Sequence, residues 1–518
     1  MVISWTAFAD VGKNFHMGFS AIDYAVLLLY LAGITVFGMM FRRSQRTVKD
    51  YFIGAKDTHW IIISLSIVAT ETSTITLIGV PAIAYANYAR PEQGGNFTYL
   101  QVVLGYIVAR FIISFLFIPA YFRGELLTAY ELLRRRFGPK TKNFAASLFL
   151  GMRAMGEGIR IFSASLVLSA VLGASMPQLP LLWLWSIIIV GLLTMIYTFE
   201  GGIAAVIWTD LIQLIIYVGG SLLAAYELLH LVPGGWNAIA AQAAAANKFQ
   251  IVSFKFDLTV PFTFWAGLLG GTFLTMASHG TDQLLVQRLL TCRSKRDSQK
   301  AIILSGFVVL FQFVLFLLIG IMLYAYYQTG ASKPILESND QIFPFFIVRQ
   351  LPHGISGLVI AAIFAAAMSN LSGSLNSLSS STALDLYKPL INPQISDESL
   401  LRMSRWFTVG WGLVLIVIAI ASKSFTKSVL NTALTIASLP YGAMLGAFLL
   451  GVLTKRANQK GVMTGMAVAL GVMLYVWLRT PLAWTWYVLT GTIICSSVGY
   501  AVSLITGAAK NIETVPNS

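Results

Sequence analysis

The chain has 518 residues, of which 57% are hydrophobic and 11% are charged, and its mean hydropathy is +0.75. This composition excludes a soluble globular protein, because too little polar surface is available to face water. The net charge of +14 does not indicate a nucleic-acid partner, since the basic residues fall in alternate loops between apolar runs. We therefore expect an all-α polytopic membrane protein whose surroundings are a lipid bilayer.

The apolar runs are long enough to cross a hydrocarbon core of roughly 30 Å, and each must be helical because lipid cannot satisfy an open backbone. We expect thirteen spans, starting near Ser20, His59, Phe97, Phe144, Leu181, Ala205, Phe262, Ala301, Gly357, Trp406, Ser428, Gly461 and Trp484. The connecting loops are too short for a nucleotide-binding or catalytic domain, and the two cysteines give no disulfide framework. These features argue against an enzyme.

The basic residues indicate the topology. Residues assigned to one set of loops are Arg42, Arg43, Arg46, Lys49, Arg123, Arg134, Arg135, Arg136, Lys140, Arg288, Arg293, Lys295, Arg296, Lys388, Arg402, Lys455, Arg456, Lys460 and Lys510. The opposite loops, such as 231–261 and 328–353, carry few basic residues. The positive-inside rule then predicts a plasma-membrane protein, in a bacterium the inner membrane, with its N-terminus outside and its C-terminus in the cytoplasm.

The second span contains a hydroxyl-rich stretch from Ser66 to Gly79, reading SIVATETSTITLIG. Hydroxyl side chains compete for the helix backbone and weaken it. Ordinary hydrogen bonding between helices is one interpretation. We favour a broken helix whose freed carbonyls and hydroxyls line a site, because the stretch also contains Glu71 and ends near Pro81.

The fourth span carries Arg153, Glu157 and Arg160 at spacings that place all three on one helical face. One interpretation is a self-neutralising triad inside the bundle. The other is that Arg160 reaches into a cavity, where its guanidinium donates to a carboxylate or hydroxyl of a solute.

Two later spans hold single ionisable residues. Asp210 lies in the apolar stretch GGIAAVIWTDLIQ, and such a carboxylate is costly at membrane depth unless it meets an ion, a cavity or a partner. Asp210 is therefore a candidate cation ligand. His279, in MASHGTDQLLVQR, either satisfies hydrogen bonds within the bundle or donates to a solute.

The ninth span is the most polar. From Ser369 it presents a series of hydroxyls and amides, and facing the second span it would supply the hard oxygens that an alkali cation needs. These residues are Ser369, Asn370, Ser372, Ser374, Asn376 and Ser377. In the eleventh span Pro440 bends the helix and supports a hinge only together with the other features.

In the order of its motifs the chain resembles the sodium/solute symporter family, which includes the sodium/glucose cotransporters. The motifs are DYFIGAK (50–56), SIVATETSTITLIG, GGIAAVIWTDLIQ, GTDQLLVQR, SNLSGSLNS and GAFLLGVLTKR (446–456). The resemblance implies a leucine-transporter-type core of two inverted five-helix repeats, with the solute midway between broken helices. The repeats would be residues 46–235 and 236–456, flanked by an additional first helix (1–45) and two C-terminal helices with a short tail (457–518).

The resemblance also implies a sodium site shared by the second and ninth spans. Its residues would be Ala69, Thr72, Ala366, Ser369 and Asn370. Many members of the family have serine where Asn370 stands. Asp210 and Ser372 match positions of a second sodium site in some members, but Gly373 replaces an expected hydroxyl. We therefore favour one sodium ion, with Asp210 acting as a nearby electrostatic or gating group; two ions remain an alternative.

The expected function is sodium-coupled symport of a small polar solute by alternating access, with Na⁺ as the coupling ion, no organic cofactor, and a single chain as the working unit. The solute is a sugar or polyol, or a carboxylated compound such as a sialic acid or monocarboxylate. Residues expected around it are Glu71, Ser73, Thr76, Gln101, Arg160, Thr275, Ser278 and His279. The alternatives are proton coupling through Glu71, Asp210 or His279 in the same fold, and a channel lined by the hydroxyls.

Overall fold

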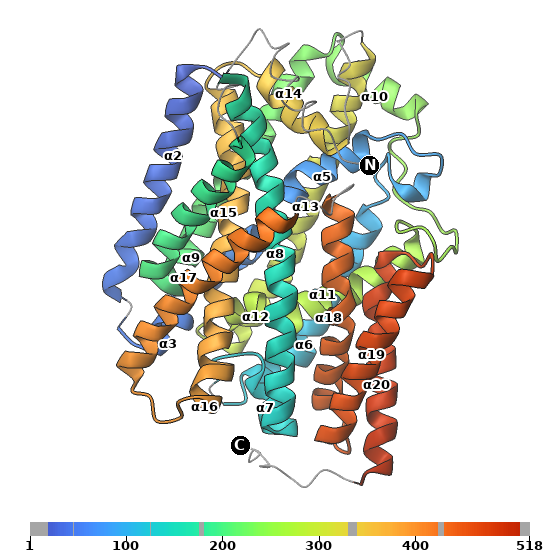
Figure 1. The fold of residues 1–518 in the computed structure, drawn as a ribbon. Helices are drawn as coiled ribbons and strands as arrows, with labels where there is room; N and C mark the ends of the chain where they lie inside the picture. Colours follow the sequence, from blue (N-terminus) through green and yellow to red (C-terminus); the bar gives the residue numbers. More distant parts are fainter. Residues whose placement is uncertain are drawn as a thin grey trace.

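The computed structural model describes most of the chain as a bundle of helices (Figure 1). The described residues are 19–44, 46–124, 126–175, 181–329, 339–422 and 429–507. Eight helical segments within them are long and apolar enough to cross a membrane, and one bent pair adds a ninth. The protein is therefore a multi-pass membrane protein.

Each of the thirteen expected spans falls on helix. The helices are α2 (Ala21–Met39), α4 (Trp60–Glu71) with α5 (Thr74–Tyr85), α6 (Leu100–Tyr121), α8 (Pro139–Ser175), α9 (Leu182–Leu231), a π-helical turn (Ala266–Gly270) leading into α11 (Gly271–Gly280), α13 (Lys295–Gln328), α15 (Ile355–Ser381), α17 (Asp397–Ala421), α18 (Val429–Leu453), α19 (Gln459–Arg479) and α20 (Tyr487–Ile505). Between α11 and α13 lies α12 (Gln283–Leu290). Shorter helices in the connections are α3 (Val48–Phe52), α7 (Glu131–Phe137), α10 (Gly235–Ala245), α14 (Ile342–Gln350) and α16 (Lys388–Leu390).

The fifth and sixth expected spans are joined in the single long segment α9, which bends at Gly202. Gly202 has φ 54° and ψ −154°. A residue with a Cβ atom is strained in that region, whereas glycine enters it freely. The glycine therefore turns the chain between two spans without an intervening loop.

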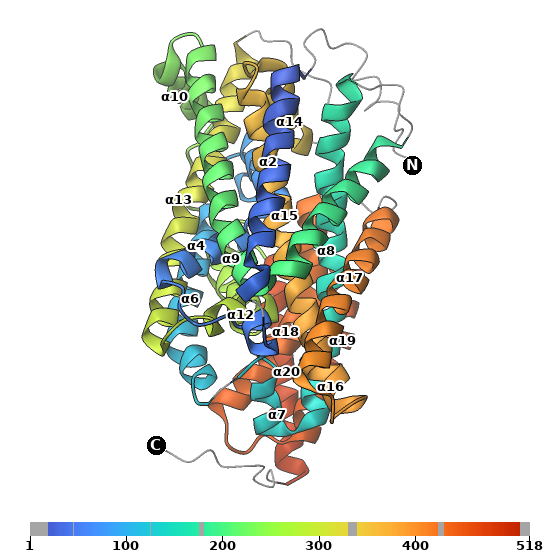
Figure 2. The same ribbon diagram turned by 90° about the vertical axis from the view of Figure 1, so that its left-hand side faces the viewer.

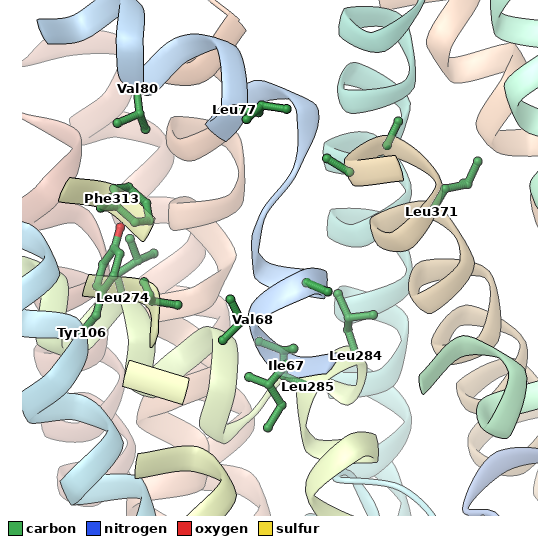
Figure 3. Close-up of a cluster of buried hydrophobic side chains, with 14 of the residues drawn as sticks. Ile67, Val68, Leu77, Val80, Tyr106, Leu274, Leu284, Leu285, Phe313 and Leu371 are labelled. Atoms are coloured by element: carbon green, nitrogen blue, oxygen red, sulfur yellow. The ribbon is translucent and has the colours of Figure 1, made fainter. Parts of the chain in front are cut away.

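The second span is broken, as its hydroxyl-rich sequence predicts. Helices α4 and α5 meet at an angle of 66°, and Thr72 and Ser73 between them have extended backbone. Figure 3 shows this extended link, with Val68 before it and Leu77 after it. The last carbonyls of α4 and the first N–H groups of α5 thus lack a continuing helix and are available to other partners.

The break lies inside the bundle, between α15 on one side and α13 on the other. Helix α15 packs along α9, and α2 packs against both (Figure 2). Helices α19 and α20 lie side by side against α18, at the opposite edge of the bundle from α2 (Figure 1). This arrangement places α4, α9 and α15 around one buried region.

The C-terminal end of α5 is held by a lysine from the loop that follows α10. Lys248 Nζ donates to the carbonyls of Ala84, Tyr85, Ala86 and Gly95 at 3.0–3.2 Å. The bonds to Ala84, Tyr85 and Ala86 satisfy carbonyls that the end of α5 leaves open, and the bond to Gly95 ties in the following loop. The C-terminal end of the half-helix α5 is thereby fixed.

Candidate functional site

The break in the second span lies directly against the polar half of α15. Asn370 Nδ2 donates to the carbonyl oxygen of Thr70 at 2.6 Å, and Thr74 Oγ1 donates to the carbonyl oxygen of Ile363 at 3.2 Å. The break frees the Thr70 carbonyl from a continuing helix and places Thr74 in the first turn of α5. Both bonds therefore depend on the break. The predicted meeting of the second and ninth spans is therefore present in the structure.

Oxygen atoms gather where these two elements meet. Asn370 Oδ1 is buried and has no hydrogen-bond partner among the described residues, although its Nδ2 is engaged. Thr72 Oγ1 donates to the Val68 carbonyl at 2.9 Å and accepts from Gln312 Nε2 at 2.6 Å. Ala69 and Ala366 are fully buried on the two elements. An unpartnered buried amide oxygen is costly unless it meets a ligand or water.

Asp210 forms the centre of a second cluster. Its Oδ1 accepts from Ser369 Oγ at 2.6 Å, and its Oδ2 accepts from Ser66 Oγ at 2.5 Å and from Thr70 Oγ1 at 3.1 Å. Arg288 Nη2 donates to the same Oδ2 at 2.9 Å. Asp210 thus joins α4, α9, α12 and α15 through one carboxylate.

The partner of Asp210 corrects one expectation. Arg288 was assigned to a basic cytoplasmic loop, but its side chain is 0% exposed and lies on α12, inside the bundle. Its other donors bind Ser66 Oγ at 3.0 Å and the Leu284 carbonyl at 2.8 Å. The assignment failed because Arg288 precedes the genuinely polar run Arg293–Arg296 by only a few residues, and charge clustering alone does not show where a helix ends.

A third cluster surrounds Glu71 at the end of α4. Arg110 Nη2 donates to Glu71 Oε2, and His279 Nε2 lies 3.3 Å from the same oxygen. Ser278 Oγ is 2.9 Å from His279 Nδ1. The carboxylate is 16% exposed, whereas the side chains of Arg110 and His279 are 1% and 3% exposed. Glu71 is thus more accessible to a solute than its two ionisable partners, Arg110 and His279.

Sequence reasoning missed Arg110. The residue lies in the middle of α6, where Arg110 Nε also donates to Ser305 Oγ at 3.1 Å. The rule that singled out Asp210 applies equally to an arginine in an apolar span. That signal was present in the sequence.

The charged residues of the fourth span divide between two partners, so they do not form a single triad. Arg153 pairs with Asp282, and both Arg153 and Asp282 bind the Tyr441 hydroxyl. Arg160 pairs with Glu157 at 3.2 Å, and its side chain is 23% exposed. Helical spacing placed these residues on one face, but Arg153 pairs with the carboxylate of Asp282, the N-cap residue of α12.

The other expected solute residues have different surroundings. Ser73 Oγ and Thr76 Oγ1 lie 3.4 Å apart at the start of α5, and Thr275 is buried on α11. Gln101 donates to the carbonyls of Thr98 and Phe262 and accepts from the Ser253 N–H, so its amide is fully engaged by backbone.

Ser372 Oγ donates to the Ser369 carbonyl at 3.0 Å. Its hydrogen is therefore directed along α15 and not toward Asp210.

The geometry suits a small cation and a polar solute bound side by side. Neutral oxygens lie close together at the α4–α5 break. Glu71 is the last residue of α4, directly before this break, and it pairs with Arg110. Broken membrane helices use such freed carbonyls to coordinate Na⁺. A ligand at this point contacts both halves of the second span.

Comparison with known proteins agrees with the family resemblance of the sequence motifs. A family model described as the sodium:solute symporter family matches residues 51–469. The sodium/sialic acid symporter NanT of Aliivibrio fischeri is 30% identical over an alignment of 495 positions that covers 93% of each chain. The sodium-coupled monocarboxylate transporter 2 of Bos taurus is 26% identical over 560 residues, covering 97% of this chain and 86% of that relative.

A solved structure of a Na⁺-coupled sialic acid symporter, in a substrate-bound outward-open state, matches with a TM-score of 0.86 at 29% identity. It covers 95% of this chain and 99% of that chain. The match confirms the expected leucine-transporter-type architecture.

Proposed function

Because the chain belongs to the sodium:solute symporter family, it is a sodium-coupled secondary transporter and not an enzyme, and we propose that its coupling ion binds where the α4–α5 break meets α15. The ligands would be oxygens of Ala69, Thr72, Ala366, Ser369 and Asn370.

The observation that carries this proposal is the unpartnered Asn370 Oδ1. Its amide nitrogen is fixed on the Thr70 carbonyl, which holds the amide oxygen in place beside the break. A sodium ion would supply the missing partner. Asparagine thereby replaces serine at this position without loss of an oxygen ligand.

The Ser369 hydroxyl also fits this role. It donates its hydrogen to Asp210, so its lone pairs remain available for a cation. Asp210 then orients a ligand without contacting the ion. This matches the expectation that, with one sodium ion, Asp210 acts as a nearby electrostatic group.

For the solute we propose a small, hydroxyl-rich carboxylated compound of the sialic acid class. Glu71 offers a carboxylate that accepts hydroxyl hydrogens, and Arg160 is the guanidinium with the greater exposure, 23% against 1% for Arg110. Arg160 would exchange part of its contact with Glu157 for the carboxylate of the solute. His279 and Ser278 would complete the polar wall.

Sodium transport and solute transport would be coupled because both ligands bind at the α4–α5 break. Sodium bound between α4 and α15 favours the conformation that accepts the solute, and the effect is reciprocal between the two ligands. Moving one positive charge inward through about 100 mV supplies roughly 2.3 kcal/mol. At about 1.4 kcal/mol per factor of ten, this term alone supports roughly fiftyfold accumulation.

We propose the topology and assembly that the loop charges predict: an N-terminus outside, a cytoplasmic C-terminus, a bacterial inner membrane, and a single chain as the working unit in the lipid bilayer. The terminal residues 1–18 and 508–518 lie outside the described residues. The inverted repeats would be residues 46–235 and 236–456, with residues 1–45 and 457–518 as additions.

The test is uptake into proteoliposomes of labelled N-acetylneuraminic acid, a short monocarboxylate and glucose, each with and without a sodium gradient. We expect saturable sodium-dependent uptake of N-acetylneuraminic acid and little uptake of glucose. Uptake driven by a pH gradient in sodium-free buffer would favour proton coupling. Unitary currents would favour a channel.

A further inference from the structure

The Asp210–Arg288 pair differs from the other ion pairs in the described part of the chain, because both of its side chains are 0% exposed. The pair lies next to the proposed sodium site, since Ser369 belongs to both. A buried carboxylate surrounded by serine and threonine hydroxyls would itself suit an alkali cation. The structure already places a cation there.

Asp210 accepts four hydrogen bonds, three of them at Oδ2. One oxygen accepts from Ser369, and the other accepts from Ser66, Thr70 and Arg288. A carboxylate offers about four lone-pair positions. Three donors therefore fill Oδ2, and a sodium ion could reach that oxygen only by displacing one of them, whereas Oδ1, with the single donor Ser369, keeps one lone-pair position.

The guanidinium of Arg288 packs against Gly373 of α15, which has no side chain. A Cβ atom on Gly373 would lie 2.7 Å from Arg288 Nη2 and 3.3 Å from Nη1. A side chain at this position of α15 would require the guanidinium of Arg288, or the Leu284 Cδ1 atom at 2.9 Å, to move. The absence of a side chain at Gly373, which removes a possible hydroxyl ligand, is thus also what admits the guanidinium.

We propose that the Arg288 guanidinium is the resident cation of Asp210, so that this carboxylate takes no sodium ion and each chain binds one sodium ion, at the α4–α5 break. The count of one rests on the proposed function; the exclusion of sodium from Asp210 does not.

The physical reason is charge balance in a low-dielectric interior. Asp210 and Arg288 neutralise each other, so a sodium ion bound directly to Asp210 would gain little net attraction from the pair and would meet the guanidinium charge at close range. The stoichiometry is therefore built into the fold.

The experiment is to count ²²Na⁺ sites by equilibrium binding to the purified full-length chain in detergent, with no solute present. We expect one site in the wild type. Arg288→Gln removes the charge but keeps a polar side chain, so Asp210 becomes available and the count should rise to two. The double variant Asp210→Asn, Arg288→Gln should return the count to one.

Arg153→Gln is the matched control. It also removes a buried guanidinium from a buried carboxylate, Asp282, but that carboxylate has a single hydroxyl neighbour among the described residues, Tyr441, where Asp210 has three. The control should bind one sodium ion. Arg288→Lys, which restores a cation, should also bind one.

Two sites in the wild type would overturn the proposal, and this count decides even where Arg288→Gln cannot be purified as a folded protein. One site in Arg288→Gln, or two in the double variant, would equally overturn it. If the wild type bound none and Arg288→Gln bound one, the proposed site at the break would fail while the role of Arg288 stood.

Discussion

Two carboxylate–guanidinium pairs contact the second half of α4, and they differ in access. The Asp210–Arg288 pair is fully buried on both sides, with Ser66 and Thr70 of α4 bound to the carboxylate. In the Glu71–Arg110 pair, at the end of the same helix, the carboxylate is 16% exposed. The same type of ion pair is thus a fixed contact at Asp210–Arg288 and an exchangeable contact at Glu71–Arg110.

The difference follows from what breaking each pair costs. Removing one partner of a fully buried ion pair leaves an uncompensated charge in the interior. An accessible carboxylate, in contrast, can exchange one polar partner for another. A transporter needs both kinds of pair: one that keeps its helices in register, and one that yields to the solute.

The largest effect should come from breaking the fully buried Asp210–Arg288 pair. Asp210→Ala leaves Arg288 buried without its carboxylate, and we expect a loss of about 3–5 kcal/mol in unfolding free energy. Thermal unfolding in detergent measures it. Glu71→Ala is the comparison and should cost clearly less, because its site admits water. Equal losses would abolish the distinction between the two pairs.

Glu71→Gln should weaken the solute more than the ion. The side chain keeps its size but loses the charge that accepts hydroxyl hydrogens, so half-saturation for the solute should rise about tenfold, equivalent to about 1.4 kcal/mol. The sodium concentration for half-maximal uptake should stay nearly constant. The reverse pattern would move Glu71 into the ion site.

Ser369→Ala should act on sodium instead. The variant removes a proposed ligand and one of the bonds to Asp210, a loss of about 1 kcal/mol that corresponds to roughly a fivefold higher sodium requirement. Ser377→Ala on the same helix removes a hydroxyl that only donates to the Ser374 carbonyl. This control should leave the sodium titration unchanged, and a similar shift in both variants would count against the site.

The smallest effect is expected for Ser278→Ala. Ser278 Oγ lies 2.9 Å from His279 Nδ1 and orients the imidazole beside Glu71. Loss of this one bond should change solute half-saturation about twofold, since a single neutral hydrogen bond contributes about 0.5 kcal/mol at the lower end of its usual range. Uptake at varied solute concentration tests it; a change in sodium affinity alone would contradict the assignment.

The sequence was sufficient for the fold because membrane helices have a strong local signal. Apolar runs located the spans, and the hydroxyls around Thr72 indicated the break, since both depend on the backbone needs of the segment itself. The family resemblance then supplied the order of the helices. Nothing local, however, indicated that Gly202 would join two spans into α9.

The partners of charged residues were harder to predict. Arg153 was grouped with Glu157 by spacing, yet it binds Asp282, and Arg288 was placed in a loop, yet it binds Asp210. Helical spacing gives the face of a residue but not the helix that faces it. Such pairings depend on tertiary packing, which a single sequence does not contain.

The most direct measurement is a sodium titration of labelled N-acetylneuraminic acid uptake in proteoliposomes carrying the wild type or Asn370→Ala. Loss of the unpartnered Oδ1 should raise the sodium concentration for half-maximal uptake about tenfold, with solute half-saturation unchanged at saturating sodium. An identical sodium titration for the two proteins would contradict the placement of the coupling ion between α4 and α15.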